Sequence, residues 1–283
     1  MTAAGIFFTH LKRERVRRHF RRLVAETKGQ VTWHFVYNPD AGARPHAPFV
    51  YDDPADVMTG RYGAMMRHGG IQGGFLDTAL FPLLRALRAS HLWVMEYDVD
   101  FAGPWNELFA QFADSDADLL TTMLTYREQC PDWANWRGAT APSWVAEDRM
   151  VRGLHPLMRL SRDLVNWYPA AMADSAWGGH YEFTLPTSAL AAGARIEDLG
   201  GDGPFTPPER RGRTYLGNPP NGGRSDDATF VFRPARPRYF YEAPDDFDRP
   251  GLLYHPIKPG VRAWTNKSKN RRPPSDRSDS PGA

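Results

Sequence analysis

The sequence has 283 residues, a hydrophobic fraction of 41% and a net charge of +2 at neutral pH. This length and composition are typical of one large α/β domain or of two average domains. The low net charge disfavours a protein that binds nucleic acid through bulk positive charge, and the single cysteine, Cys130, excludes both an intrachain disulfide and a zinc site of several thiolates.

The sequence also predicts a soluble, cytoplasmic protein. It has no apolar run of the roughly 20 residues that cross a bilayer. Near the N-terminus the apolar stretch 5–9 comes before the charged residues, which is the reverse of the order in a signal peptide.

The first 37 residues predict a strand, a helix and a second strand. Residues 5–9 are apolar, and residues 11–27 place apolar side chains at helical spacing on one face, with arginines crowding the rest. Gly29 ends this helix, and residues 31–37 form a second strand pattern. Such a βαβ start indicates a parallel sheet with helices packed on it.

Alternating elements continue through the middle of the chain. In order, the patterns predict a loop-rich segment 40–74, a helix 76–89, a strongly apolar strand 91–97, a helix 103–112, a buried strand 118–124 and an irregular, tryptophan-containing segment 127–150.

The C-terminal half carries weaker patterns. They predict a helix over 154–172, a strand or short helix over 181–193, a loop over 200–225 and a strand over 229–232. We expect one folded domain over residues 1–266, divided near residue 125 into two halves. Residues 267–283 lack apolar side chains, so we expect a disordered tail.

The main chemical feature is the acidic segment Glu96-Tyr97-Asp98-Val99-Asp100, which follows the apolar strand 91–97. If the backbone stays extended, the three carboxylates share one face. At the carboxyl end of a parallel strand this face opens into the crevice where α/β sheets bind ligands. Clustered carboxylates repel one another unless a hard cation such as Mg²⁺ or Mn²⁺ lies between them. The alternative is an acidic loop that caps a buried strand.

Four segments carry a resemblance to a known family. The segments FFTH, WVMEYDVDFAGPW, WGGHYE and YHPIK occur in this order, and Asp98-Val99-Asp100 matches a DxD motif. Over about residues 5–260 the chain resembles nucleotide-sugar-dependent glycosyltransferases of the GT-A fold. The resemblance implies an α/β fold with a Rossmann-like, mostly parallel sheet flanked by helices, followed by an irregular C-terminal region on the acceptor side. It also implies a nucleotide-binding half at 1–125 and an acceptor-binding half at 126–266.

The resemblance further implies a donor site with Mn²⁺ or Mg²⁺, in which UDP is the expected nucleotide. Asp100 is expected to be the firmer metal ligand, Asp98 a metal or ribose contact, and His255 a third ligand. The remaining donor contacts, expected from their positions, are Thr9 and His10 for the base, and Gly74 and Asp77 for the ribose or sugar.

The acceptor side is expected in the segment 177–182. Glu182 is the expected general base of an inverting transfer, and Trp177 is expected to stack on a sugar, with Gly179 and His180 beside it. An ordinary glycine turn with a solvated glutamate is the alternative. If Glu182 is not the base, Asp174 or Asp198 takes that role, or the enzyme retains configuration and needs no base.

The expected partners are a nucleotide-sugar donor and a carbohydrate or other hydroxyl acceptor. The arginines of helix 11–27 and the segment 207–211 also allow weak contact with an anionic membrane surface, whereas no nucleic-acid partner is expected.

Two other functions remain open from the sequence. In a haloacid-dehalogenase-like phosphohydrolase, Asp98 is the nucleophile and Asp100 the acid/base, with Thr121 or Thr122 supplying a hydroxyl. A GT-A-like fold can also serve as a non-catalytic glycan- or nucleotide-binding module.

Overall fold

A computed structural model describes residues 3–11, 13–37, 73–220, 223, 225–232 and 247–257. The predicted tail 267–283 and nearly all of the predicted loop 40–74 lie outside these residues. Within the described part of the chain, no helix combines the length and the apolar composition needed to cross a bilayer.

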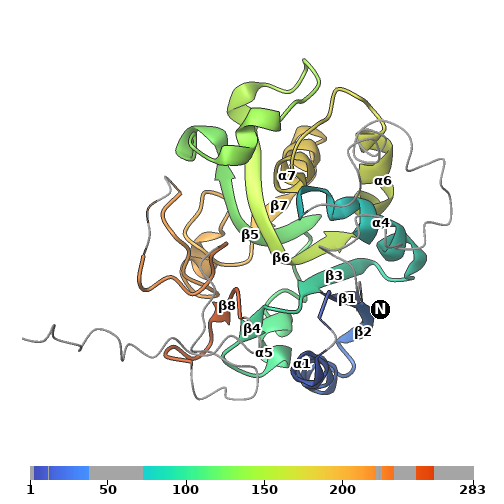
Figure 1. Cartoon of the computed structure of the whole chain (residues 1–283), viewed down its shortest axis with the longest axis vertical. Coiled ribbons are helices and arrows are strands. Elements are labelled where there is room, and N and C mark those ends of the chain that lie inside the picture. The colour runs from blue at the N-terminus through green and yellow to red at the C-terminus, as the bar shows by residue number, and fades with distance from the viewer. Residues whose placement is uncertain are drawn as a thin grey trace, which may run out of the picture.

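The described strands build one central six-stranded sheet (Figure 1). They are β1 (Ala3–Thr9), β2 (Val31–Tyr37), β3 (His91–Glu96), β5 (Leu119–Tyr126), β6 (Val151–Ser161) and β7 (Ile196–Asp198), in the spatial order β2-β1-β3-β6-β5-β7. β6 is antiparallel to both of its neighbours, and the other pairings are parallel. The predicted mixed α/β architecture with a mostly parallel sheet is confirmed, and it is compatible with a Rossmann-like arrangement.

Helices cover both faces of this sheet (Figure 1). On one face lie α4 (Asp77–Ala86), α6 (Arg162–Met172) and α7 (Tyr181–Ala191), and on the other lie α1 (Glu14–Glu26) and α5 (Trp105–Ala110). The strands supply both cores because their side chains alternate: Leu92 and Val94 pack toward α4 and α6, whereas Trp93 and Met95 pack toward α1 and α5. Both faces of β3 are therefore buried, which explains its continuous apolar sequence.

A second, smaller sheet joins two distant parts of the chain. β4 (Asp100–Phe101) pairs antiparallel with β8 (Leu253–Tyr254), so that Asp100 lies opposite Tyr254. This pairing brings the segment after β3 next to the segment that contains His255. The 3-10 turns are η1 (Gly73–Phe75), η2 (Arg127–Gln129), η3 (Ala134–Gly138), η4 (Glu147–Arg149) and η5 (Pro208–Arg210).

The prediction of a single helix over 154–172 is wrong. The strand β6 occupies Val151–Ser161, and α6 begins only at Arg162. β6 lies between β3 and β5 with both faces buried, and the periodicity of such an apolar run cannot separate a strand from a buried helix. Pro156 lies in the stretch where the pairing of β6 with β5 is irregular, which is where a sheet tolerates a proline.

Two shorter segments are also decided by the structure. Residues 181–193, predicted as a strand or a short helix, contain the helix α7. The predicted strand 229–232 is reduced to a single bridge between Phe230 and His255.

Candidate functional site

The carboxyl end of β3 lies at a reversal of strand order. β1 continues through α1 to β2 on one side, and β3 lies on the other side of β1. In open α/β sheets, ligands bind outside the carboxyl ends of the strands at such a switch point. Glu96 is the last residue of β3, and Asp98 follows in the turn that leads to β4.

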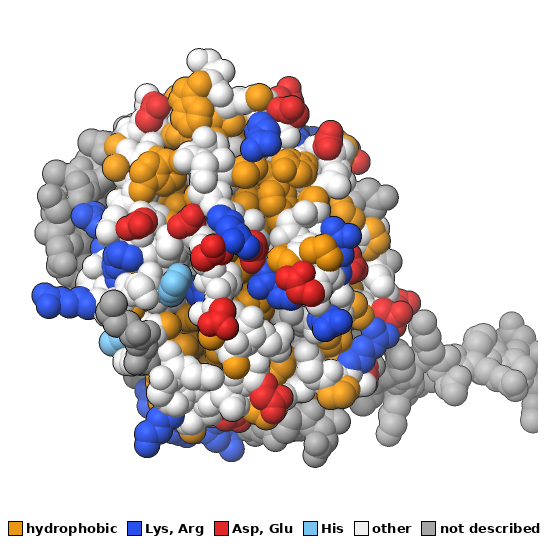
Figure 2. All heavy atoms as spheres, turned by 180° about the vertical axis from the view of Figure 1, so that it is seen from behind, with side chains coloured by type: hydrophobic (Ala, Val, Ile, Leu, Met, Phe, Trp, Pro, Cys, Tyr) orange, Lys and Arg blue, Asp and Glu red, His pale blue; other side chains and the backbone are white. Residues whose placement is uncertain are grey.

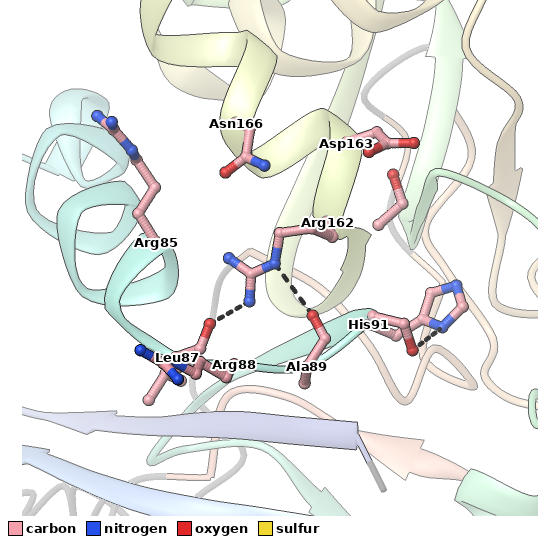
Figure 3. A pocket seen from close by; sticks show the side chains of 10 residues that line it. Arg85, Leu87, Arg88, Ala89, His91, Arg162, Asp163 and Asn166 are labelled. Carbon is pink, nitrogen blue, oxygen red and sulfur yellow. Dashed lines mark hydrogen bonds between the residues drawn. The ribbon is translucent and has the colours of Figure 1, made fainter. Parts of the chain in front are cut away.

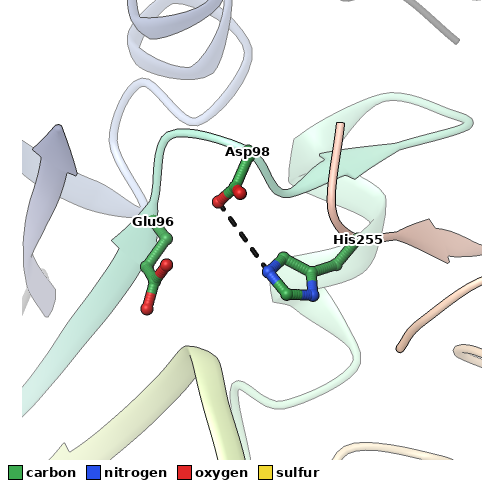
Figure 4. Close-up of side chains that lie close together, drawn as sticks. All are labelled: Glu96, Asp98 and His255. Atoms are coloured by element: carbon green, nitrogen blue, oxygen red, sulfur yellow. Dashed lines mark ion pairs between the residues drawn. The ribbon is translucent and has the colours of Figure 1, made fainter. Parts of the chain in front are cut away.

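Glu96, Asp98 and His255 converge at this position (Figure 4). Each offers one ligand atom, and these atoms lie within 4.8 Å of one another. The Nε2 atom of His255 is 3.8 Å from Oδ1 of Asp98. Asp98 and His255 are buried, with exposed fractions of 1% and 5%, while Glu96 is half-buried. The chain thus places two carboxylates and an imidazole around one small space.

His255 is oriented for ligation by a bond on the far side of its ring. Nδ1 lies 2.7 Å from the carbonyl oxygen of Val231, so Nδ1 carries the proton and donates it there. The lone pair of the neutral ring is then on Nε2, the atom that faces Asp98. Metal-binding histidines commonly have this arrangement, in which the second ring nitrogen donates to a carbonyl or carboxylate.

The spacing of Asp98 and His255 is compatible with two ligands of one divalent cation. With metal–ligand bonds of about 2.1 Å, ligand atoms of an octahedral site lie about 3 Å apart when adjacent and about 4.2 Å apart when opposite. The 3.8 Å between His255 and Asp98 falls in this range. Carboxylate oxygens favour Mg²⁺ and Mn²⁺, and the imidazole adds a ligand that transition metals accept.

Asp100, predicted to be the firmer metal ligand, is not part of this cluster. Its carboxylate accepts a hydrogen bond from Nη1 of Arg22 on α1 at 3.0 Å and one from the backbone N–H of Phe101 at 2.7 Å. Burial raises the pKa of Asp100 to about 7, and the charge of Arg22 opposes this rise. Because β3 ends at Glu96 and a turn follows, the expected alternation along 96–100 breaks before Asp100.

The sequence also contains the signal for Glu96 in this cluster. Glu96-Tyr97-Asp98 has the same spacing as Asp98-Val99-Asp100, and Glu96 directly follows the apolar part of the strand. To choose between these two acidic pairs, one must know at which residue the strand ends. Pairing to β1 sets that end, because β1 pairs with β3 up to Glu96, and the N–H of Tyr97 donates to the carbonyl of Phe8.

The four residues predicted to contact the nucleotide separate into two groups. Thr9 ends β1, and His10 follows it and lies edge-on to Tyr97 with ring centroids 5.0 Å apart. Both therefore lie beside the turn that contains Asp98. Gly74 and Asp77 instead lie beside α7 and α6. A Cβ on Gly74 would be 2.8 Å from the ring of His180, and Asp77 accepts a hydrogen bond from the hydroxyl of Tyr168.

The predicted acceptor segment forms the start of α7. His180 is the N-cap of this helix, and its Nδ1 accepts the backbone N–H of Glu182. Gly179 has φ = 104°, a conformation that favours glycine, and a Cβ there would be 2.8 Å from the carbonyl oxygen of Gly138. The start of α7 therefore packs closely against the irregular loop 127–150 at this glycine.

Trp177 does not have the exposed face that sugar stacking requires. Its side chain belongs to the core, with 4% of the residue exposed, and packs near Phe183. Trp144, from the irregular loop, lies edge-on to Trp177 and is 62% exposed. Trp144 therefore offers an exposed aromatic ring beside Trp177.

Glu182 has the environment of an acid/base group. It is 7% exposed, and Oε2 is 3.5 Å from Nδ1 of His180. Burial raises the pKa of Glu182 to about 8, while the positive charge of Arg152 opposes the rise. Burial raises the pKa of the adjacent Tyr181 hydroxyl, and the charges of Glu96, Glu182 and Asp77 raise it further. Sequence reasoning did not single out Tyr181.

Asp174 and Asp198, the two alternative candidates for the general base, have different surroundings. Asp174 is exposed and accepts the backbone N–H of Ala176. Asp198 is fully buried and accepts bonds from the backbone N–H groups of Gly200 and Gly201 and from the hydroxyl of Tyr215. These bonds make Asp198 a structural residue of the fold.

The side chains that a phosphohydrolase would need do not gather around Asp98. The hydroxyls of Thr121 and Thr122 are buried and donate to the carbonyl of Leu154, and Asp100 is directed at Arg22.

Two described cavities lie at the opposite, amino end of β3. The larger, of about 760 Å³, is bordered by Arg85, Arg88 and Arg162 (Figure 3). Arg162 already donates to the carbonyls of Leu84, Leu87 and Ala89 and so joins the end of α4 to the start of α6. A second cavity, of about 430 Å³, borders His91 and Arg159. Acidic and basic side chains are interspersed on the molecular face in Figure 2.

No protein-family model matches the chain, and no curated protein matches it in sequence. Its function is therefore inferred from geometry and chemistry.

Proposed function

We propose that this protein is a metal-dependent glycosyltransferase with a GT-A-like fold, which transfers a sugar from a nucleoside-diphosphate sugar to a hydroxyl acceptor. The observation that carries the proposal is the convergence of Glu96, Asp98 and His255 at the strand-order reversal of the sheet. The motif order resembles that of GT-A glycosyltransferases, in which an acidic pair after an apolar strand holds the metal.

The three converging residues hold the cation in this proposal. A bound divalent ion supplies Lewis-acid stabilisation of the charge that develops on the leaving diphosphate. The protein's part is to fix two carboxylates and one imidazole in a buried position, with the His255 ring held by Val231. Thr9 and His10 lie beside the same turn and provide the nucleotide side of the site, for which we propose UDP.

Glu182 is the proposed base. In an inverting transfer the acceptor oxygen forms a bond to the anomeric carbon while the bond from that carbon to the β-phosphate oxygen breaks. The acceptor proton moves to the Glu182 carboxylate, and the nucleoside diphosphate leaves with the electron pair. The pKa of about 8 gives Glu182 a stronger affinity for that proton than an exposed glutamate has.

The first experiment tests the metal centre. Asp98→Asn keeps the shape of the side chain and removes its charge, so we expect loss of Mn²⁺-dependent UDP binding in calorimetry. Asp132→Asn, at an exposed aspartate outside the cluster, is the matched control and should bind as the parent does. Equal binding by Asp98→Asn and the parent would refute the proposed site.

The second experiment tests the base. Glu182→Gln should leave UDP and Mn²⁺ binding intact and lower turnover at saturating acceptor by about 10²–10⁴-fold, the range of general acid–base catalysis. Because the carboxylate form is the active one, kcat/KM of the parent should rise with pH up to about 8, and the variant should lack this rise. A variant that turns over normally once saturated would show that Glu182 only positions the acceptor.

A further inference from the structure

The small sheet of β4 and β8 fixes the relative position of two of the three proposed metal ligands, Asp98 and His255. Asp98 lies two residues before β4 and His255 immediately follows β8, and these strands pair with each other. The backbone N–H of Ile257 also donates to the carbonyl of Asp98 at 2.7 Å. The distance between the two ligands is thus set by the position of β4 against β8.

Helix α1 holds this small sheet against the main body of the protein. Nη1 of Arg22 donates to both carboxylate oxygens of Asp100, at 3.0 and 3.4 Å. Nη2 donates to the carbonyls of Phe101 and Gly103, and Nε donates to Glu26. One guanidinium therefore bonds to three residues within the four positions that follow the metal-ligand turn.

A second contact from α1 reaches the turn itself. Nε2 of the buried His19 lies 2.8 Å from the carbonyl oxygen of Val99. Burial lowers the pKa of His19 to about 3, so the ring is neutral and donates an N–H to this carbonyl. Together with Arg22, His19 thus ties α1 to the backbone on the C-terminal side of Asp98 at the carbonyls of Val99, Phe101 and Gly103.

We propose that Arg22 is a positioning residue for the metal centre and acts through Asp100, which serves as an anchor for the guanidinium and not as a ligand. This inference depends on the proposed function, because it concerns the geometry of that same cation site. Arg22 suits the role because its planar fork can bond a carboxylate and two carbonyls at once, whereas a lysine offers one ammonium group. Residues that orient metal ligands typically change metal affinity by 10–100-fold when they are replaced.

The test measures Mn²⁺ binding by calorimetry and by the electron paramagnetic resonance spectrum of the bound ion. Arg22→Lys should weaken Mn²⁺ binding by about 10–100-fold and alter the spectrum, with the melting temperature recorded for each variant. Arg21→Met is the control, because the adjacent Arg21 is exposed and its side chain pairs with Glu14. It should bind Mn²⁺ within about twofold of the parent.

A double variant distinguishes an anchor from a ligand. Arg22→Met alone removes the guanidinium and leaves the buried Asp100 carboxylate without its positive neighbour, which can destabilise the fold. Arg22→Met combined with Asp100→Asn removes both charges together, so no isolated charge stays buried and the protein is expected to fold. The single variants Arg22→Met and Asp100→Asn are measured beside the double variant. If Asp100 is an anchor, the double variant binds Mn²⁺ no more weakly than whichever of these two single variants has the lower affinity.

Three results would overturn the inference. Parent-like Mn²⁺ affinity in Arg22→Lys would show that the guanidinium does not position the ligands. Tighter binding in Arg22→Met would show that Asp100 is a ligand which Arg22 restrains. Absence of Mn²⁺ binding in the parent would refute the proposed metal centre itself, an outcome distinct from the other two.

Discussion

Burial decides the protonation of individual side chains in this protein. Glu182 and His19 are both almost completely enclosed, and in each case loss of water disfavours the charged form. The pKa of the acid is therefore raised to about 8 and that of the histidine is lowered to about 3. The first change produces a group that exchanges a proton near neutral pH, and the second produces a permanently neutral donor for Val99.

The raised pKa of Glu182 predicts a pH dependence of stability. Between pH 4.5 and about 8 the folded protein keeps a proton that the unfolded chain has released. Folding stability from this group therefore falls as pH rises through that window and is constant above it. Glu182→Gln should remove the fall, so its free energy of unfolding should exceed that of the parent increasingly toward pH 8, by at most about 5 kcal/mol.

Urea unfolding at pH 5 and pH 8.5 checks this prediction. Glu128→Gln, at an exposed glutamate, is the control and should change stability equally at the two pH values. A difference between Glu182→Gln and the parent that does not depend on pH would mean that Glu182 is ionised in the folded state throughout.

Among the elements, the junction of β6 and α6 shows how one side chain ends a strand and begins a helix. Ser161 is the last residue of β6 and the N-cap of α6. Its Oγ accepts the backbone N–H of Leu164 at 3.1 Å and donates to Asp118 at 2.8 Å. The cap satisfies a backbone donor at the start of the helix, and the second bond ties the junction to the segment before β5.

Ser161→Ala should therefore destabilise the fold. Loss of an N-cap costs about 0.5–2 kcal/mol of stability, and loss of the hydrogen bond from Ser161 to Asp118 adds to this cost. We expect a melting temperature lower by a few degrees in calorimetry. Ser175→Ala, at an exposed serine, should leave the melting temperature within about one degree of the parent value. Equal melting temperatures for both variants would contradict the capping role.

At the scale of the whole molecule, the proposed cation site links parts of the chain that are far apart in sequence. Glu96 ends β3 in the centre of the sheet and Asp98 follows it, whereas His255 follows β8 near the end of the described residues. A ligand that needs all three side chains binds only the folded state. Its binding energy therefore adds to the stability of the whole fold.

Mn²⁺ should accordingly raise the melting temperature of the parent. At a concentration of 100 times its dissociation constant, the ion adds about 2.7 kcal/mol to the free energy of unfolding, and a chelator should reverse the change. Glu96→Gln should lose most of this stabilisation, and Asp132→Asn should keep it. The same thermal shift in Glu96→Gln as in the parent would show that the ion binds elsewhere.

Several features of the protein are determined by its sequence alone. The described strands and helices of residues 3–37 and 73–125 follow from short-range periodicity, because alternating or helical spacing of apolar side chains indicates which faces can be buried. The position of an acidic segment directly after a strongly apolar strand is likewise visible without a structure, and so is the late His255. These signals come from residues that are close together in the sequence, and they predict a candidate site at the end of β3, where Glu96 and Asp98 lie.

The tertiary structure alone decided which of these side chains meet. Glu96 and not Asp100 joins Asp98 because pairing with β1 ends β3 at Glu96, and Asp100 is then taken by Arg22. β6 is a strand because it lies between β3 and β5, and Trp177 is enclosed by the core. Each outcome depends on contacts between residues far apart in sequence, whose geometry is set by the packing of the complete sheet and its helices and not by local spacing.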